Sequence, residues 1–313
     1  MKPVIAVTGA SGFVGSALCR HLQALGHPVV PMLRTPRPEW PEARIVGELG
    51  PDTDWTNALE GVHVVVHCAA RAHIALRPGP QDLEICRRIN VEGTRSLAQA
   101  AVRCGVQRLV HVSSIKVLGE RSRPGEPLRA DSPPAPEDAY GISKWEAEQA
   151  LLAVAAQSSL QTVIVRPPLV YGPGVKANFL RLMQAVHRGV PLPLGSIRNL
   201  RSMVALDNLT DLLALCAVRP AAAGETFLVS DGQDLSTPDL IRGMALALGR
   251  PARLIPFPPA GLRLAGRLTG RADQIERLIG SLQADIGHTR RVLQWAPVCT
   301  VQQGLQSATR DVR

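Results

Sequence analysis

VIAVTGASGFVG, residues 4–15, joins an apolar run to three glycines that stand three residues apart. Val4–Thr8 has the composition of a buried strand, and apolar residues at helical spacing follow from Ser16. In such a turn the first glycine accepts a positive φ, the second lets the backbone approach a diphosphate, and the third lets helix and strand pack closely. The amino end of the helix then faces the phosphate charge. This stretch predicts a turn that binds the diphosphate of a dinucleotide.

The same alternation of strand and helix continues to about residue 166. Short β-branched runs, too apolar for a half-exposed sheet, alternate with longer segments whose apolar residues recur at helical spacing. Strands buried on both faces and separated by helices indicate a parallel sheet. We therefore predict the α/β fold class, with a Rossmann-type doubly wound parallel sheet. The expected strands cover residues 4–8, 28–33, 62–67, 108–113 and 162–166, and the expected helices cover residues 16–25, 88–104 and 139–157.

The composition changes after residue 166, where proline and glycine become frequent, as in loops. A basic amphipathic stretch, residues 262–282, is of a kind that can lie on a membrane surface, but we favour a helix packed against its own domain. Other helical patterns cover residues 179–188, 207–218 and 238–248. The predicted Rossmann domain covers residues 1–172 and 199–230, and a smaller C-terminal substrate-binding lobe covers residues 173–198 and 231–313.

Charge and cysteine content narrow the class of protein. The formal net charge is +9, and only four of the 35 basic residues are lysine, so arginine supplies most of the charge. These residues are scattered, without the run typical of a nucleic-acid arm, so we expect no nucleic-acid partner. Six widely spaced cysteines predict a reducing compartment and no metal site. No run approaches the ~18 apolar residues of a membrane span, and the first apolar run is too short for a signal peptide, so we expect a cytoplasmic protein without a membrane span.

The end of the second expected strand bears on the choice of cofactor. An acidic residue at this position binds a ribose 2′-hydroxyl, whereas arginine accommodates the 2′-phosphate of NADP. Residues 32–37 read MLRTPR, with no acid at the strand end. We therefore expect NADP(H) to be favoured over NAD(H), with Arg34 and Arg37 as phosphate ligands. The alternative for Arg34 is a solvated loop residue.

Tyr140 and Lys144 form the third informative pattern. Residues four apart on a helix share a face, so the lysine ammonium can stand near the phenol. A nearby positive charge lowers the pKa of a phenol, which would let Tyr140 exchange a proton near neutral pH. The chain has only two tyrosines and four lysines, so chance is a poor explanation of this spacing.

Three patterns together resemble the extended short-chain dehydrogenase/reductase family, which includes nucleotide-sugar epimerases, dehydratases and reductases. They are the glycines at 9, 12 and 15, Ser113-Ser114 at the end of an expected strand, and Tyr140 four residues before Lys144. The resemblance implies that Ser114 binds the reacting sugar oxygen and that Tyr140 is the acid/base. It also implies that Lys144 holds the nicotinamide ribose.

The resemblance extends to most of the chain and implies a set of binding residues. Those expected to bind the cofactor are Gly9, Ser11, Gly12, Phe13, Val14, Gly15, Arg34, Arg37, Glu48, Leu49, Cys68, Ala69, Ala70, Tyr140, Lys144 and Pro167. Those expected to bind the substrate are Ser114, Lys116, Asn178 and Arg201. Asn178 as a helix cap and Arg201 as a surface ion-pair partner are the alternatives. Family members often form homodimers through the helices around Asn90 and Tyr140, and we expect the same here.

The residues after Ser114 favour one branch of the family. Sugar 4,6-dehydratases carry an Asp-Glu pair there, whereas this chain has Ile115-Lys116, and lysine cannot do the work of a carboxylate. The chain most resembles proteins of bacterial surface-polysaccharide synthesis. The first hypothesis is therefore NADP(H)-dependent reduction of the C4 keto group of a nucleotide-linked sugar, UDP-4-keto-6-deoxy-N-acetylglucosamine. The second is a UDP-glucose or UDP-N-acetylglucosamine 4-epimerase with tightly bound NAD. A non-catalytic NADP-binding sensor is the third, and the intact Tyr140/Lys144 pair disfavours it.

Overall fold

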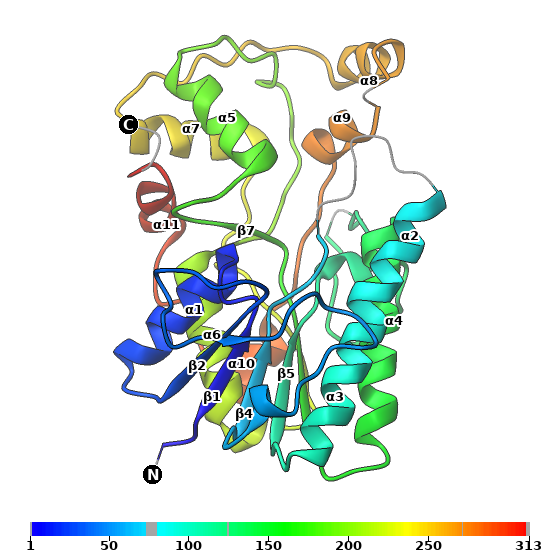
Figure 1. Ribbon diagram of the computed structural model, residues 1–313. Helices are drawn as coiled ribbons and strands as arrows, with labels where there is room; N and C mark the ends of the chain where they lie inside the picture. The colour runs from blue at the N-terminus through cyan, green and yellow to red at the C-terminus, as the bar shows by residue number, and fades with distance from the viewer. Residues whose placement is uncertain (1, 73–79, 124, 271, 311–313) are drawn as a thin grey trace.

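The computed structural model describes residues 2–72, 80–123, 125–270 and 272–310. Seven parallel strands form the main sheet in the order β3-β2-β1-β4-β5-β6-β9, in the lower half of Figure 1. This arrangement is the doubly wound Rossmann type, so the predicted fold class is confirmed. The strands are β1 (Ile5–Thr8), β2 (Val29–Leu33), β3 (Arg44–Ile45), β4 (Val64–His67), β5 (Arg108–Val112), β6 (Gln161–Arg166) and β9 (Thr226–Leu228).

Helices cover both faces of this sheet (Figure 1). On one face α3 and α4 bury Leu97 and Leu151 with the sheet, and on the other α1 and α6 bury Leu18 and Leu212. Because both faces are covered, the strands can be apolar throughout, as the sequence predicts. The helices are α1 (Phe13–Ala24), α3 (Gly93–Arg103), α4 (Ala139–Ala155) and α6 (Leu206–Val218).

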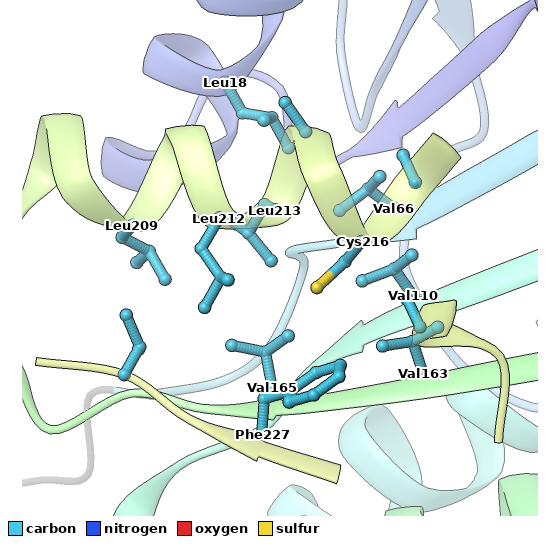
Figure 2. Packing of buried hydrophobic residues seen from close by; sticks show 14 of the residues in the cluster. Leu18, Val66, Val110, Val163, Val165, Leu209, Leu212, Leu213, Cys216 and Phe227 are labelled. Carbon is cyan, nitrogen blue, oxygen red and sulfur yellow. The ribbon is translucent and has the colours of Figure 1, made fainter. Parts of the chain in front are cut away.

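The packing of α6 follows directly from the spacing of its apolar residues. Leu209, Leu212, Leu213 and Cys216 recur every three or four positions, so they lie on one side of the helix and point at the sheet (Figure 2). All four side chains are fully buried. Full burial of one such leucine contributes about 1.5–3 kcal/mol. Their neighbours on the sheet include Val66, Val110, Val163, Val165 and Phe227.

A second group of helices lies beyond the carboxyl ends of the strands, in the upper half of Figure 1. It buries a separate core that includes Phe179, Met244 and Leu305. The short parallel pair β7 and β8 lies between the two cores, because Val204 packs into the main core and Tyr171 into the second. These elements are β7 (Leu169–Tyr171), α5 (Ala177–His187), β8 (Met203–Ala205), α7 (Thr237–Leu248), α8 (Pro259–Leu268), α9 (Ala272–Ile279) and α11 (Val301–Ala308).

Near the C-terminus the chain returns to the main sheet through α10 (Gly287–Leu293), whose Leu293 packs in the main core with Ile286 and Trp295. The division into two domains at residues 172, 199 and 230 stays a prediction. The remaining short elements are η1 (Asn57–Leu59), α2 (Pro80–Cys86), the π-helix η2 (Arg87–Glu92), η3 (Ile115–Val117) and η4 (Pro220–Ala222).

Two expectations need correction. The basic stretch 262–282 is two helices, α8 and α9, because the first ends at Thr269 and Gly270 follows with φ +65°. Residues 88–104 begin in a π-helix and continue as α3 rather than forming one α-helix. The sequence analysis also missed β3, β7, β8 and β9, which have two or three residues each and too little periodicity to be recognised. No described helix is both long enough and apolar enough to cross a membrane.

Candidate active site

The glycine turn after β1 fits a diphosphate. Gly9 has φ +67°, and a Cβ added there would lie 2.9 Å from the backbone of Ala69. A Cβ on Gly15 would lie 2.2 Å from the carbonyl oxygen of Gly9, so the helix approaches this closely only because position 15 is glycine. Helix α1 starts after Gly12 with no side-chain cap and no acidic residue in its first turn. Its amino end is therefore available to an anion. Ser11 lies exposed in the turn, and Phe13 and Val14 begin the helix.

The segment after β4 is fixed by buried polar contacts. His67 Nδ1 lies 2.7 Å from the Thr8 hydroxyl, and its Nε2 lies 3.2 Å from the Thr94 hydroxyl. Burial, with the charge of Lys144, lowers the pKa of His67 to about 3, so its ring is neutral. Asn90, in the π-helix, accepts a hydrogen bond from the Arg71 amide at 2.8 Å. These bonds hold the half-buried residues Cys68, Ala69 and Ala70 beside the glycine turn.

The end of β2 carries an exposed ion pair. Arg34 Nη1 lies 3.2 Å from Glu48 Oε1, and the two side chains are 65% and 76% exposed. Arg37 is also exposed, whereas Leu49 packs half-buried against the core under β2. The structure thus pairs Arg34 with Glu48, whereas the sequence predicts that each of them contacts the cofactor separately. A carboxylate at this distance repels a phosphate that approaches Arg34.

The two serines after β5 have different environments. Ser113 donates a hydrogen bond to Glu148, which is fully buried on α4 and also accepts from Arg166 at 3.0 and 2.6 Å. Ser114 points instead toward the amino end of η3, where its hydroxyl accepts from the Lys116 amide at 3.2 Å. Pro167 stands next to it, since its carbonyl accepts from the Ile115 amide. Ser113 is therefore structural, and Ser114 has lone-pair and donor capacity left for a substrate.

Tyr140 and Lys144 lie on the first turns of α4, as expected, but their electrostatics differ from the expectation. Burial and the negative charges of Asp138 and Cys86 raise the pKa of Tyr140 to about 12. Lys144 is buried and places its Nζ 3.0 Å from His111 Nε2, and no hydrogen bond joins Tyr140 to Lys144 among the described residues. The expected lowering of the phenol pKa is wrong for this arrangement, because the ammonium is directed at His111 and a carboxylate stands near the phenol.

The expected substrate residues lie in different settings. Lys116 forms ion pairs with Asp138, the cap of α4, and with Glu120 at 2.8 Å. Arg201 donates to the carbonyl oxygens of Arg277 and Gly280, at 2.9 and 3.1 Å, so it is no surface ion-pair partner. Asn178 is exposed and is not the cap of α5, a position held by Lys176. Both alternatives considered for Asn178 and Arg201 are therefore wrong, while their contacts with a substrate stay predictions.

Ion pairs connect the loop after Ser114 to the upper helices. Glu120 accepts from Lys116 and, at 3.1 Å, from Arg277 on α9. Burial alone would raise the pKa of Glu120, but the hydrogen bonds and charges of these two cations lower it to about 2. This network was not predictable from the sequence, because its members are 4 and 157 residues apart and form no motif. Glu148 was missed as well, although a glutamate one helical turn after Lys144 was a usable signal.

Fold and site together define a nicotinamide-dependent oxidoreductase: a glycine turn shaped for a diphosphate lies on the same sheet edge as Ser114, Tyr140 and Lys144. The chain belongs to the NAD dependent epimerase/dehydratase family, whose model matches residues 5–230. Among the described residues, no three His, Cys, Asp or Glu side chains are grouped as a metal ion would require.

Similar proteins include nucleotide-sugar enzymes. A protein of Vibrio cholerae named UDP-glucose 4-epimerase is 43% identical over 313 residues, covering 99% of this chain and 95% of the relative. An Escherichia coli O157:H7 protein named N-acetyl-alpha-D-glucosaminyl-diphospho-ditrans,octacis-undecaprenol 4-epimerase is 26% identical over 82% of this chain and 77% of its own length. The solved structure of MoeE5 in complex with UDP-glucose and NAD superposes with a TM-score of 0.78, at 27% identity and 99% coverage of both chains. The chain is thus an enzyme of the NAD(P)-dependent nucleotide-sugar oxidoreductase and epimerase class.

Proposed function

We propose that this enzyme is a UDP-hexose 4-epimerase that oxidises the 4-hydroxyl of the sugar and reduces the resulting ketone from the other face. The observation that carries the proposal is the presence of Ser114, Tyr140 and Lys144 together in a chain that is 43% identical, over almost its full length, to a protein named UDP-glucose 4-epimerase. The Ile115-Lys116 sequence argues against a dehydratase, because it lacks the additional acid and base.

The residues divide the chemistry among them. Tyr140 takes the proton of the 4-hydroxyl and later returns it, which requires an approach to within about 3 Å of that oxygen. Ser114 orients the same oxygen, and Lys144 holds the nicotinamide ribose. Since the Lys144 ammonium is directed at His111, stabilisation of the phenolate requires that it also approach Tyr140. The nicotinamide supplies the acceptor and donor of hydride when it is bound. Because the pKa of Tyr140 is about 12 beside Asp138, the charge of Lys144 is essential to the proton-abstraction step.

We propose NAD(H) as the cofactor, in place of the NADP(H) expected from the sequence. Glu48 supports this choice, because it stands 3.2 Å from Arg34 and adds the carboxylate that the strand end lacks. That carboxylate can accept hydrogen bonds from ribose hydroxyls and opposes a 2′-phosphate. The NAD in the structure of MoeE5 is consistent with it.

A 4-ketoreductase is the second candidate, and two features of the site favour it. Arg34 at the end of β2 suits the 2′-phosphate of NADP once it leaves Glu48. A phenol with a pKa of about 12 is a proton donor at neutral pH, as reduction of a ketone requires. This enzyme would reduce UDP-4-keto-6-deoxy-N-acetylglucosamine with NADPH.

The nucleotide that accompanies the purified protein separates the two candidates. The protein is denatured and the released nucleotide is identified by mass spectrometry, and the native protein is incubated with UDP- and dTDP-sugars with and without NADPH. An epimerase retains NAD and converts UDP-glucose or UDP-N-acetylglucosamine without added cofactor. If the denatured protein releases no nucleotide, and only the keto sugar is converted and only with NADPH, the enzyme is the reductase and not the epimerase.

The proposal also includes a homodimer, a cytoplasmic location and a role in surface-polysaccharide synthesis.

A further inference from the structure

Lys144 has a neighbour that the proposed mechanism does not use. Its Nζ lies 3.0 Å from Nε2 of His111, on β5, and both side chains are buried. His111 pairs in register with His67 on β4, and the two rings are 5.5 Å apart. His67 cannot take over the contact, because both of its ring nitrogens already face Thr8 and Thr94.

The geometry determines where the proton of His111 lies. An ammonium group is a donor only, so Nε2 of His111 must accept from Lys144, and the ring proton must then sit on Nδ1. That Nδ1 is buried and has no hydrogen-bond partner among the described residues. A buried donor without a partner destabilises a fold, so the contact with Lys144 must outweigh that cost. Burial, Lys144 and His67 lower the pKa of His111 well below its usual value, which keeps the ring neutral and able to accept.

Few other groups are able to hold the ammonium. The titratable groups that interact with Lys144 are His67 at the end of β4, Cys68 directly after it, His111 on β5 and Glu148 on its own helix. Glu148 acts through its charge alone, because its oxygens already accept from Ser113 and Arg166. Burial lowers the pKa of Lys144 to about 8, and the charge of Glu148 opposes this shift.

We propose that His111 is a positioning residue for Lys144: its neutral ring accepts one of the three ammonium N–H bonds and directs the other two toward the ribose and the phenol. The role of Lys144 toward cofactor and phenol rests on the proposed function, but the contact with His111 does not. Loss of the acceptor should therefore lower the pKa of Lys144 and change cofactor binding and turnover through it.

Selective labelling tests this inference without any assay of activity. The chain has four lysines, so lysine labelled with ¹³C at Cε gives four side-chain signals, and the Lys144→Ala variant assigns the one of interest. His111→Phe, which keeps a ring of similar shape, should lower the measured pKa of Lys144 by about one unit, which is a ten-fold change in its ionisation constant. His111→Gln, which offers an amide oxygen, should restore it toward the wild-type value. An unchanged pKa in His111→Phe overturns the proposal.

The wild-type protein supplies a second test, in case His111→Phe does not fold. Histidine labelled with ¹⁵N should show His111 with a protonated Nδ1 and an unprotonated Nε2 at neutral pH. The opposite tautomer, or a charged ring, overturns the proposal. If no UDP-sugar is converted while both tests succeed, the proposed function fails and the positioning role stands.

A separate observation concerns the surface around α8. Residues 240–272 contain six arginines and no acidic residue. The three most exposed large apolar side chains among the described residues lie in the same segment: Leu268 at 80%, Leu246 at 71% and Leu264 at 60%. Leu264 and Leu268 lie on α8, which stands at the outer edge of Figure 1, whereas Leu246 lies on α7 at the other side of the upper half.

The two sides of α8 differ. Leu262 and Gly266 are buried on the side toward α9, where a Cβ on Gly266 would lie 2.8 Å from Ile275. Leu264 and Leu268, one helical turn apart, lie on an exposed stripe that Gly261 continues, and the ring of Phe257 lies against that glycine. One side of α8 thus packs on the protein, as expected from the sequence, and the other side is exposed.

Arginines border this exposed stripe. Arg263 and Arg267 each precede one of its leucines, and Arg263 pairs with Glu276. Arg267 has no ion-pair partner among the described residues. Leucines that alternate with exposed arginines complement a bilayer with anionic headgroups: the acyl region takes up the leucines and the headgroups bind the arginines.

We infer that the exposed stripe of α8, formed by Phe257, Gly261, Leu264 and Leu268, docks onto an anionic lipid surface. The test is co-sedimentation of the full-length protein with vesicles of phosphatidylglycerol and phosphatidylcholine, and with vesicles of phosphatidylcholine alone. Wild-type protein should bind the first and not the second. The double variant Leu264→Ser, Leu268→Ser should bind the anionic vesicles at least ten-fold more weakly, because each substitution removes several CH₂ groups that the leucine would bury in the bilayer.

The control is Val298→Ser, which changes a side chain 59% exposed outside this segment and should bind like wild type. Wild-type protein that stays in solution with both vesicles overturns the inference. A double variant that binds the vesicles as well as wild type also overturns it. So does analytical ultracentrifugation that shows a dimer of the wild-type protein and a monomer of the double variant, because the stripe would then be a protein interface.

Discussion

The ends of β5 and β2 lie on the same edge of the sheet and are built in opposite ways. After β5, Glu148 is fully buried and holds Ser113 and Arg166 by hydrogen bonds. After β2, the side chains of Arg34 and Glu48 are mostly exposed and, among the described residues, form an ion pair only with each other. One end is thus fixed by packing, whereas the other can rearrange at little cost. The comparison suggests that the class of reaction is set by buried residues and the choice between NAD and NADP by exposed ones.

The largest effect should come from Tyr140→Phe, which tests the buried end. Removing the hydroxyl removes the proton donor and acceptor but preserves the packing of the ring, so turnover should fall about 10²–10⁴-fold with cofactor affinity nearly unchanged. Steady-state kinetics and cofactor titration measure the two effects. Tyr171→Phe is the matched control, since it alters the other tyrosine of the chain, which donates to the buried Asp231. It should cost about 1–3 kcal/mol of stability and leave the turnover of folded protein unchanged.

The next largest effect should come from Glu148→Gln. This change leaves Arg166 buried without a compensating charge, which should reduce the free energy of unfolding by about 3–5 kcal/mol. Glu146→Gln, two residues earlier on α4, breaks only a half-exposed pair with Arg87 and should cost less than about 1 kcal/mol. Urea denaturation of both variants compares a buried with an exposed ion pair on one helix. Equal losses would contradict the expected difference between buried and exposed ion pairs.

A third prediction concerns pH. Burial lowers the pKa of Lys144 from its usual 10.5 to about 8. Proton abstraction needs Tyr140 as the phenolate and Lys144 as the ammonium. Because Tyr140 titrates near 12, kcat/KM should rise about ten-fold per pH unit up to about pH 8 and then level off, since loss of the ammonium offsets the gain of phenolate. The histidines nearby titrate below this range, so they do not produce the break near pH 8. Stability should change over the same range: between pH 8 and 10.5 the unfolded chain binds the extra proton, so this group makes the fold more stable as pH rises. A kcat/KM that keeps rising ten-fold per unit between pH 8 and 10 would be incompatible with a catalytic Lys144.

The smallest effect should come from Arg34→Ala at the exposed end. The surface pair contributes at most about 1 kcal/mol, so stability should hardly change. Binding of NADH should also hardly change, whereas any binding of NADPH should weaken ten-fold or more, since a charge-assisted hydrogen bond contributes about 1.5–3 kcal/mol. Isothermal titration with both cofactors provides the measurement. A wild-type protein that prefers NADPH would show that Glu48 does not block the phosphate.

The sequence predicted the parts of the molecule that depend on local pattern. These parts are the glycine turn, the apolar strands and the spacing of Tyr140 and Lys144, each of which can be recognised from a few neighbouring residues. It did not predict the contacts that join distant segments, such as Lys144 with His111 or Glu120 with Arg277, because these depend on which strands become neighbours. The error on the pKa of Tyr140 has the same origin, since the direction of the lysine side chain is decided by β5 and not by α4.

The most direct test of the central proposal follows the hydrogen at C4 of the sugar. Purified protein with no added cofactor is incubated with UDP-glucose deuterated at C4, and the products are analysed by mass spectrometry and NMR. An epimerase that oxidises and then reduces C4 within one site predicts UDP-galactose that retains deuterium at C4, with none formed by Tyr140→Phe. Unchanged UDP-glucose, together with stoichiometric consumption of NADPH when UDP-4-keto-6-deoxy-N-acetylglucosamine is supplied, would contradict the epimerase and establish the reductase.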